Sequence, residues 1–261
     1  MPTAPEPTDE ARPTGRRGRG PAPAAVEEVP VWLEVNRVPT VTWMCTPELL
    51  EELVLGWLYG EGYISSVDQV HLRPCATDLG FWADVPAELV AAVAAERRRP
   101  VLASGCGAVS TFLADPSSVT AEPLRGLPPD VTVMRERFKE LFARGARYED
   151  TGGVHAAALT DGAALLHHAE DIGRHNAVDK VLGWAVEQGR IPLSGTVLLV
   201  SGRASFELAQ KAVMAGVPIL AAVSAPSSLA VDLAAQSGLT LVAFLRGDSM
   251  NVYSRPDRIR Q

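Results

Sequence analysis

The chain has 261 residues, of which 47% are hydrophobic and 21% are charged, which is typical of a soluble globular protein and excludes a fibrous or wholly disordered one. Its formal net charge of -7 argues against general affinity for nucleic acid, so any phosphate site has to be local. Its three cysteines have no metal-type spacing, and no apolar run approaches the roughly 20 residues that span a bilayer. We therefore expect a cytoplasmic protein with no disulfide framework, no metal site and no membrane segment.

The N-terminal region begins with a biased segment. Residues 1–25 are rich in proline, glycine, threonine and arginine and contain no aromatic residue, which predicts a disordered tail. Two short β-prone runs follow at residues 31–35 and 38–43, and their two-residue separation predicts a hairpin. Thr46 precedes a proline, as an N-cap precedes the first residue of a helix, and leucines at helical spacing extend this helix to Gly60.

The next part of the chain alternates short strands and helices. Two strands and two helices are predicted at residues 67–73, 80–85, 86–98 and 133–143. A proline-rich segment separates the helix at residues 133–143 from the three elements before it. We therefore divide the chain after its tail into a smaller N-terminal α+β portion at residues 26–130 and a C-terminal α/β domain at residues 131–261.

Cys106 is the candidate reactive thiol, because it lies between two glycines in the sequence ASGCGAVS. A buried thiol normally has larger apolar neighbours, although an incidental core cysteine remains the alternative. Cys45 sits beside Trp43 and is expected in the core. Cys75 has no neighbouring histidine or second cysteine, so a metal or catalytic role is not indicated.

From residue 148 onward, apolar runs alternate with helical patterns. Strands are predicted at residues 163–167, 196–201, 217–223 and 239–245, and helices at residues 176–187, 204–215 and 227–237. The runs TVLLV, VPILAAV and LTLVAFL are apolar throughout, which is typical of parallel strands covered on both faces. The pattern predicts an α/β fold whose sheet binds ligands at the carboxyl edge of its strands.

Three short polar turns, EDIGRHN, SGRAS and SAPSS, are expected at this edge, and each opens a helix. Helix N-termini attract anions, and Arg174, Arg203 and Arg246 would add cationic groups suited to phosphate. Ordinary capping explains any single turn. Three turns at one edge favour a site for a phosphate-bearing ligand.

His155 and His175 are candidate proton shuttles that Glu170 or Asp171 could orient, with structural roles as the alternative. The adjacent histidines at 167 and 168 would face opposite sides of a strand, which is unsuitable for a shared metal. The chain lacks the Pro-Cys-x-x-Cys of zinc deaminases, and SGRAS lacks the GK[ST] ending of a P-loop. Neither deamination nor nucleotide hydrolysis is indicated.

The segments GGVHAAAL, EDIGRHNAVDK, SGRASFELAQKA, VSAPSSLAV and LTLVAFLRGDSMNVY, in this order, resemble the formate dehydrogenase accessory sulfurtransferases (FdhD). The resemblance covers residues 31–253. It implies a three-layer sandwich similar to that of cytidine deaminases but without zinc, in a cytoplasmic homodimer. It also implies a sulfurtransferase that receives persulfide sulfur from a cysteine desulfurase. This enzyme would pass the sulfur to the molybdenum bis(guanine dinucleotide) cofactor as a bound substrate and so activate formate dehydrogenase. The alternative is a chaperone that holds or delivers this cofactor without moving sulfur.

The resemblance also implies individual roles. Cys106 matches the persulfide-carrying cysteine of the family's Cys-Gly-x-Cys loop, but the second cysteine of that loop is Val109 here. A second cysteine in the loop could release the sulfur by internal disulfide exchange. Without it, Cys106 has to hand its persulfide to the next acceptor or to an outside thiol, and we expect Cys106 alone to be sufficient for this relay. The residues expected at the cofactor, or at a guanine nucleotide such as GDP in its place, are Phe244, Leu245, Arg246, Gly247, Asp248, Ser249, Arg203, Ser201, Gly202, Ser224, His155 and Arg174.

Overall fold

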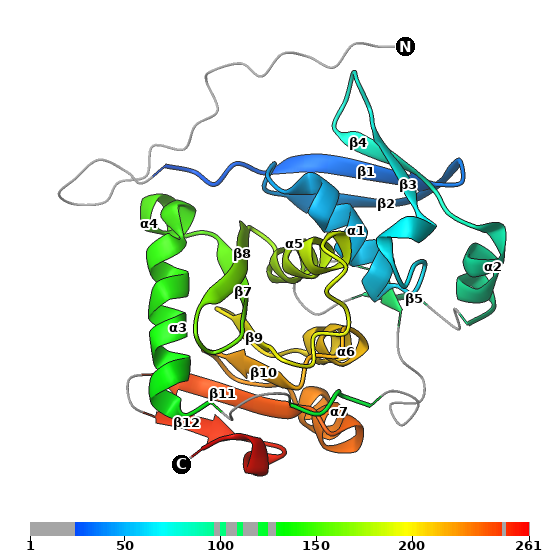
Figure 1. Cartoon of the computed structure of the whole chain (residues 1–261). Helices are drawn as coiled ribbons and strands as arrows, with labels where there is room; N and C mark the ends of the chain where they lie inside the picture. The colour runs from blue at the N-terminus through cyan, green and yellow to red at the C-terminus, as the bar shows by residue number, and fades with distance from the viewer. Residues whose placement is uncertain are drawn as a thin grey trace.

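The computed structural model describes residues 24–96, 100–102, 109–111, 120–124, 129–246 and 249–260, which form an α/β fold with two main sheets (Figure 1). This confirms the predicted fold class. Cys106 and nearly all of the predicted disordered tail lie outside the described residues.

The N-terminal sheet has the strand order β2-β1-β4-β3. Its strands are β1 (Val29–Val35), β2 (Val38–Cys45), β3 (His71–Pro74) and β4 (Gly80–Asp84). The predicted hairpin of β1 and β2 is confirmed, and its turn residues Asn36 and Arg37 have φ of 49° and 66°, as a tight hairpin turn requires. A short 3₁₀ helix at Val67–Gln69 precedes β3, where the sequence predicted a longer strand.

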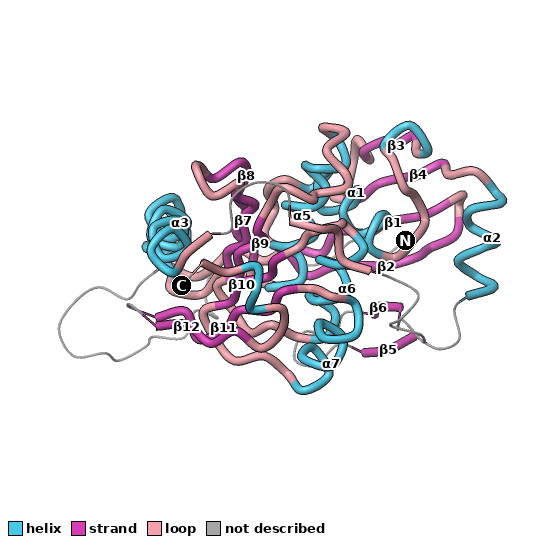
Figure 2. The backbone as a smooth tube through the Cα atoms, turned by 60° about the horizontal axis from the view of Figure 1, so that its bottom comes forward, coloured by secondary structure: helices cyan, strands magenta, loops and turns pink. Residues whose placement is uncertain are grey.

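Two helices belong to this portion, α1 (Leu50–Gly60) and α2 (Ala87–Glu96). The predicted N-cap at Thr46 is wrong, since α1 begins later and its N-cap is Leu49. Thr46 is instead fully buried, and its polar groups bond to residues of the C-terminal domain. A separate hairpin pairs β5 (Pro100–Leu102) with β6 (Val109–Thr111) and is visible beside the main body in Figure 2.

The C-terminal sheet has the strand order β12-β11-β10-β9-β7-β8. Its strands are β7 (His155–Thr160), β8 (Leu165–Asp171), β9 (Val197–Val200), β10 (Ile219–Ala222), β11 (Thr240–Arg246) and β12 (Ser249–Val252). Strands β9, β10 and β11 are parallel, as their continuous apolar runs predicted. Strand β7 is antiparallel to β8 and β9, and β12 is antiparallel to β11, so the sheet is mixed.

Helices cover both faces of this sheet and give three layers (Figure 1). They are α3 (Val131–Arg144), the short α4 (Ala146–Thr151), α5 (Arg174–Glu187), α6 (Phe206–Met214) and α7 (Ser228–Ser237). Helix α3 packs Met134, Phe138 and Leu141 into one apolar cluster with the sheet. Helices α5, α6 and α7 contribute to the larger cluster on the opposite face. Another 3₁₀ helix, Pro256–Arg258, lies near the C-terminus.

The N-terminal portion packs onto this domain through helix α1, which crosses α5 closely. A Cβ built on Gly56 of α1 would lie 1.8 Å from the carbonyl oxygen of Asp179, and one on Gly183 would lie 1.8 Å from that of Glu52. Only glycine permits this approach. The larger apolar cluster extends from Val31 in β1 to Leu241 in β11. The N-terminal sheet, formed by residues before position 130, and the C-terminal sheet, formed by residues after it, therefore share one core.

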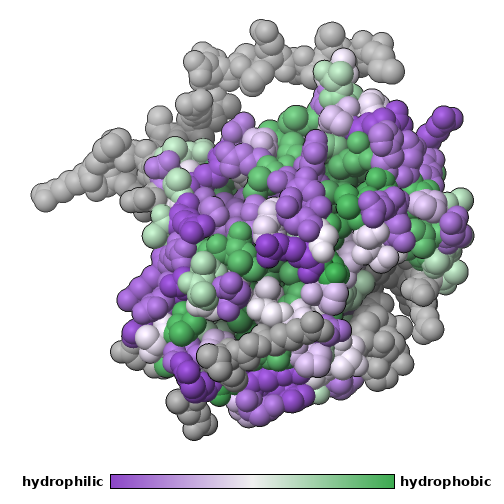
Figure 3. All heavy atoms as spheres, viewed as in Figure 1, coloured by the Kyte–Doolittle hydropathy of each residue, from purple (hydrophilic) through white to green (hydrophobic). Residues whose placement is uncertain are grey.

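The surface mixes polar and apolar residues, with apolar ones in separate groups on the face shown in Figure 3. Among the described helices, none combines the length and apolarity that crossing a membrane requires.

Candidate functional site

The carboxyl ends of β9, β10 and β11 meet at one edge of the sheet, as the sequence predicted. Ser224 donates its backbone N–H to the carbonyl oxygen of Gly202 at 3.3 Å, and Phe244 donates its own to the carbonyl of Ser224 at 3.3 Å. Ser201 lies at the same edge, where its Oγ accepts the backbone N–H of Ala156 at 2.8 Å. These bonds bring the ends of three strands into one continuous polar rim.

His155 and Arg174 join this rim from other elements. His155 is the first residue of β7, which runs antiparallel to β9, so it lies at the edge where β9 ends. Arg174 is the first residue of α5 and 6% exposed. A Cβ built on Gly202 would lie 3.4 Å from His155 Nδ1 and 3.6 Å from Arg174 Cδ. Because Gly202 has no side chain, its backbone stays accessible to a ligand between the imidazole of His155 and the side chain of Arg174.

Positive charge is concentrated at this position. Burial lowers the pKa of His155, and the charges of Arg174, His175 and Arg203 lower it further. Arg203 is exposed in the turn between β9 and α6. The field that disfavours a charged His155 would favour an anionic ligand. This arrangement fits the predicted phosphate-bearing ligand.

Strand β11 ends at Arg246, within the predicted segment 244–249, and its last described residues are irregular. Its pairing with β12 shifts register between Ala243 and Arg246, and Phe244 within this shift has φ of 52°. A bulky residue rarely adopts this conformation, and such strain is concentrated at functional sites. Phe244 is 37% exposed, whereas Leu245 is 4% exposed and packs in the core. Ser249 opens β12 and is exposed, while Gly247, Asp248 and the side chain of Arg246 lie outside the described part.

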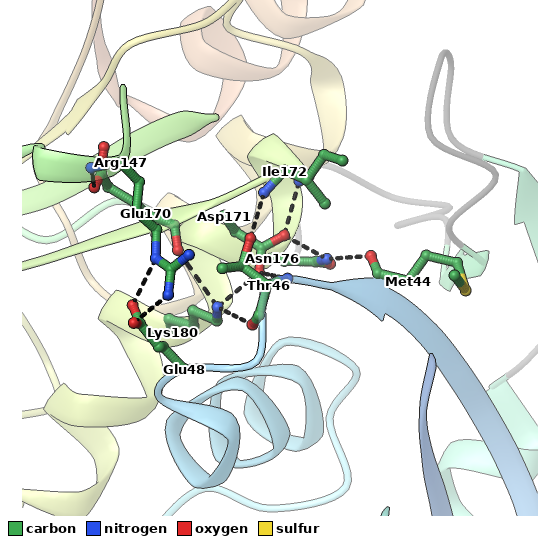
Figure 4. A network of polar contacts seen from close by, with 10 residues as sticks. Met44, Thr46, Glu48, Arg147, Glu170, Asp171, Ile172, Asn176 and Lys180 are labelled. Carbon is green, nitrogen blue, oxygen red and sulfur yellow. Dashed lines mark hydrogen bonds and ion pairs between the residues drawn. The ribbon is translucent and has the colours of Figure 1, made fainter. Parts of the chain in front are cut away.

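The turn EDIGRHN is held by a buried carboxylate, that of Asp171 (Figure 4). Its Oδ1 accepts hydrogen bonds from the backbone N–H of Gly173 at 2.8 Å and from Asn176 Nδ2 at 2.9 Å. Its Oδ2 accepts from Lys180 Nζ at 2.6 Å and from the backbone N–H of Thr46 at 3.1 Å. Asp171 therefore fixes the first turn of α5, from which Arg174 projects.

The N-terminal portion completes this network. Thr46 accepts the backbone N–H of Ile172 on its Oγ1 at 3.1 Å, and its carbonyl oxygen accepts Lys180 Nζ at 3.0 Å. The carbonyl oxygen of Met44 accepts Asn176 Nδ2 at 3.1 Å. Figure 4 shows these groups converging from the end of β2 and the start of α5. The position of α5 thus depends on residues more than 100 positions earlier in the chain.

Among the described residues, neither Asp171 nor Glu170 makes a hydrogen bond to a histidine, although Asp171 lies opposite His155 in the pairing of β7 and β8. The carboxylate of Asp171 is occupied by the groups described above, and that of Glu170 accepts the backbone N–H groups of Arg147 and Tyr148 at the start of α4. The hydrogen bonds of both acidic residues hold the starts of α4 and α5 in place.

The carboxylate beside a site histidine is instead Glu207 of α6. Its Oε2 lies 3.8 Å from Nε2 of His175, and Ser205 Oγ lies 3.4 Å from the same nitrogen. The interaction with His175 lowers the pKa of Glu207 to about 2, so this carboxylate is ionised at neutral pH. Glu207 was not singled out from the sequence. Its place in the first turn of the helix that SGRAS opens, close to the predicted ligand edge, could have indicated it.

The two described cysteines have very different environments. Cys45 is fully buried, and burial, followed by the charge of Asp171, raises its pKa to about 12. Cys75 lies in the turn between β3 and β4, where hydrogen bonds from Thr77 lower its pKa. Cys106 falls in the connection between β5 and β6, outside the described residues, and its flanking residues Leu102 and Val109 are paired.

Within the described ranges, no group of three histidine, cysteine or acidic residues is placed to hold a metal ion. His167 does not form a pair with His168, because its ring stacks on Trp184 with centroids 4.8 Å apart.

Comparison with known proteins places the chain in a family. The model of the FdhD/NarQ family matches residues 26–260. The chain belongs to the FdhD/NarQ family. Among its FdhD relatives, a sulfur carrier protein from Mycobacterium tuberculosis is 47% identical over 92% of both chains. Another sulfur carrier protein, from Streptomyces avermitilis, is 45% identical over 90% of this chain and 88% of its own.

The fold of the FdhD/NarQ family is also represented among solved structures. A crystal structure from Desulfotalea psychrophila, described as a candidate formate dehydrogenase accessory protein, superposes with a TM-score of 0.71. It is 27% identical and covers 90% of both chains. The family resemblance expected from the five motifs is therefore confirmed.

Proposed function

We propose that this protein is a sulfur carrier that takes up sulfur as a persulfide on Cys106 and delivers it to the molybdenum bis(guanine dinucleotide) cofactor of formate dehydrogenase. The observation that carries the proposal is the 47% identity, over 92% of both chains, to a relative named as a sulfur carrier protein. The donor in this proposal is a cysteine desulfurase, and the protein acts as a cytoplasmic homodimer with sulfurtransferase activity.

The environments of Cys45 and Cys75 make both of them poor candidates for the sulfur carrier, which supports Cys106 in this role. The nucleophile in persulfide exchange is a thiolate, and Cys45 is kept protonated and out of contact with solvent. Cys75 is accessible, but it lies in a hairpin turn of the other sheet, with no bond to the rim residues. Cys106 is the remaining thiol of the chain.

The loading step is a thiol exchange. The Cys106 thiolate attacks the terminal sulfur of the donor persulfide, a new S–S bond forms on Cys106, and the old S–S bond breaks to leave the thiolate of the donor. No external oxidant or reductant takes part. Delivery of the sulfur as sulfide requires two electrons, which a neighbouring thiol could supply by forming a disulfide. Because residue 109 is valine, we assign this role to a thiol outside the Cys106 loop.

The rim at the carboxyl edge is the proposed binding place for the phosphate groups of the cofactor. Arg174 and Arg203 provide fixed positive charge, and Gly202 leaves the backbone accessible between His155 and Arg174. The aromatic ring of Phe244 lies at the same edge and is suited to contact a guanine base. GDP, which carries the same base and two phosphates, is the simplest probe of this site.

The loading step can be tested by mass spectrometry of the intact protein. After incubation with a cysteine desulfurase and free cysteine, we expect one added sulfur atom, 32 Da in mass, located on Cys106 and removed by dithiothreitol. The matched control is Cys106→Ala, which should gain no sulfur, and Cys75→Ala should be loaded like the wild type. An unloaded wild type, or equal loading of Cys106→Ala, would contradict the proposal.

A complementation assay separates sulfur transfer from the alternative function of a cofactor chaperone. The described residues of the rim include no cysteine, so a chaperone that only holds the cofactor there would not need Cys106. We expect Cys106→Ala to leave formate dehydrogenase inactive in a strain that lacks its own FdhD protein. Restoration of activity by Cys106→Ala, at the same protein level as the wild type, would establish the chaperone function instead.

A further inference from the structure

Thr46, directly after β2, contacts the start of α5 through both its backbone and its side chain. Its backbone N–H donates to Asp171 Oδ2 at 3.1 Å, and its carbonyl oxygen accepts Lys180 Nζ at 3.0 Å. Its Oγ1 accepts the backbone N–H of Ile172 at 3.1 Å. The backbone bonds do not depend on which side chain stands at position 46. The hydroxyl group therefore has a contact of its own, with Ile172.

This contact acts on a helix start that has no side-chain cap. The N-cap of α5 is Gly173, whereas a helix start is commonly held by the side-chain oxygen of its N-cap residue. The two N–H groups that precede the helix are held instead by other residues. That of Gly173 donates to Asp171 Oδ1 at 2.8 Å, and that of Ile172 donates to Thr46 Oγ1. One of the two bonds that set the direction of this turn thus comes from the N-terminal portion.

Arg174 follows this turn directly, as the first residue of α5 and two positions after Ile172. A change in the backbone at residues 172–173 therefore moves Arg174 as well. Its side chain runs along the ligand rim, because its Cδ lies 3.6 Å from a Cβ built on Gly202. A hydrogen bond from arginine to phosphate depends strongly on distance and angle, so a displacement of about 1 Å weakens it.

We propose that Thr46 is a positioning residue for the ligand site, whose hydroxyl group holds Ile172 and thereby orients Arg174 toward a phosphate group bound at the rim. This inference rests on the ligand site of the proposed function and deepens it, because it assigns part of the affinity to the N-terminal portion. Without the hydroxyl group, the N–H of Ile172 loses its acceptor in a partly buried place. The turn then shifts toward another acceptor and carries Arg174 with it.

Isothermal titration calorimetry of the full chain with GDP tests this role. Thr46→Val keeps the shape of the side chain and both backbone bonds but lacks the hydroxyl group, and we expect it to weaken GDP binding about fivefold or more. Thr46→Ser keeps the hydroxyl group and should bind GDP within about twofold of the wild type. The matched control is Thr40→Val, because Thr40 Oγ1 also accepts a backbone N–H, that of Val35 at 3.2 Å, but in the β1–β2 hairpin. This control should bind GDP like the wild type.

A double-mutant cycle shows whether Thr46 acts through Arg174. If it does, Arg174→Gln combined with Thr46→Val should bind GDP no more weakly than Arg174→Gln alone. Arg203 belongs to a different turn, so the effects of Arg203→Gln and Thr46→Val should add. The melting temperature of each variant shows whether it is folded. General destabilisation would lower the melting temperature but would not produce this coupling with Arg174.

Hydrogen exchange of the wild type tests the inference without any variant. Opening of the bond between Ile172 and Thr46 exposes the Ile172 amide and displaces Arg174, so a bound ligand should oppose this opening. At a GDP concentration 100 times Kd, we expect exchange of the Ile172 amide to slow by up to about 100-fold. The amide of Val35, which is bonded to Thr40, should keep its exchange rate.

Four results would overturn the inference and leave the proposed function standing. They are wild-type GDP affinity of Thr46→Val, equal losses of affinity in Thr46→Ser and Thr46→Val, additive effects of Thr46→Val and Arg174→Gln, and unchanged exchange of the Ile172 amide when GDP binds. Absence of GDP binding to the wild type would overturn the inference and also remove the ligand site from the proposed function. Sulfur loading on Cys106 is measured independently of all these results.

Discussion

Lys180 Nζ lies 2.6 Å from Asp171 Oδ2, and neither side chain exposes any surface to solvent. A buried ion pair is tolerated only when the remaining donors and acceptors are also satisfied. Here the carbonyl oxygen of Thr46 accepts from Lys180, and Gly173 and Asn176 donate to Asp171. The pair therefore stabilises the fold as part of a complete network, and removal of one partner leaves a buried charge.

We expect Lys180→Met to lower the free energy of unfolding by about 3–5 kcal/mol, because it leaves the Asp171 carboxylate buried without its counter-ion. Urea denaturation followed by circular dichroism measures this loss. The control is Glu48→Gln, which removes the partner of Arg147 from a largely exposed ion pair and should cost at most about 1 kcal/mol. A loss below about 1 kcal/mol for Lys180→Met would show that the pair does not stabilise the fold.

The close crossing of α1 and α5 gives a second prediction. We expect Gly56→Ala and Gly183→Ala each to destabilise the protein by about 3 kcal/mol or more, because each new methyl group would overlap a carbonyl oxygen of the facing helix. Thermal unfolding measures the change. Glu51→Ala on the exposed face of α1 is the matched control and should change stability by less than about 0.5 kcal/mol. Wild-type stability of both glycine variants would contradict the crossing.

The cysteine environments predict different reactivities. In a Cys106→Ala background at about pH 8, we expect iodoacetamide to modify Cys75 and leave Cys45 intact, because the pKa of Cys45 is raised to about 12 and that of Cys75 is lowered. Thiolate on Cys45 becomes abundant only as the pH approaches that raised value. Peptide mass spectrometry measures both sites, and unfolding in guanidinium should remove the difference. Faster modification of Cys45 than of Cys75 in the folded protein would refute this prediction.

The strained backbone and the exposed ring of Phe244 predict that its replacement has opposite effects on stability and on ligand binding. We expect Phe244→Asn to keep or raise the melting temperature, because asparagine tolerates the positive φ of 52° better than phenylalanine. We expect the same variant to weaken GDP binding by about fivefold or more, through loss of the exposed ring at the rim. Tyr253→Asn is the control, since Tyr253 is 39% exposed and bonded to Leu241 near the opposite end of β11. Equal GDP affinity of Phe244→Asn and the wild type would exclude a role for the ring.

The sequence predicted the parallel core of the sheet because β9 and β10 are apolar at every position and β11 is apolar from Leu241 to Leu245, as strands covered on both faces require. It did not predict β7, whose sequence HAAALT is rich in alanine, a residue with low β propensity. Burial between two layers of helices, rather than propensity, makes this segment a strand. The short β12 was missed because its pairing with β11 shifts register between Ala243 and Arg246, which breaks the regular alternation that a sequence pattern reveals.

The candidate site was predictable to the extent that it follows from topology. The ends of consecutive parallel strands meet at one edge, so the placement of Ser201, Gly202 and Ser224 could be inferred. The partners of Asp171 could not, because Thr46 lies 125 residues away and its hydrogen bond depends on how α1 packs against α5. The local pattern of threonine followed by proline predicted an N-cap, but a tertiary contact uses Thr46 instead.

The contact between Thr46 and the start of α5 has a consequence for how this protein can be divided or recombined. A fragment comprising residues 131–261 would contain every described residue of the ligand rim, but not the backbone groups of Met44 and Thr46 that complete its support. Exchange of the first portion for that of a distant relative would have to preserve the end of β2 and its angle to α1. The two portions therefore have to be expressed, truncated or exchanged as one unit.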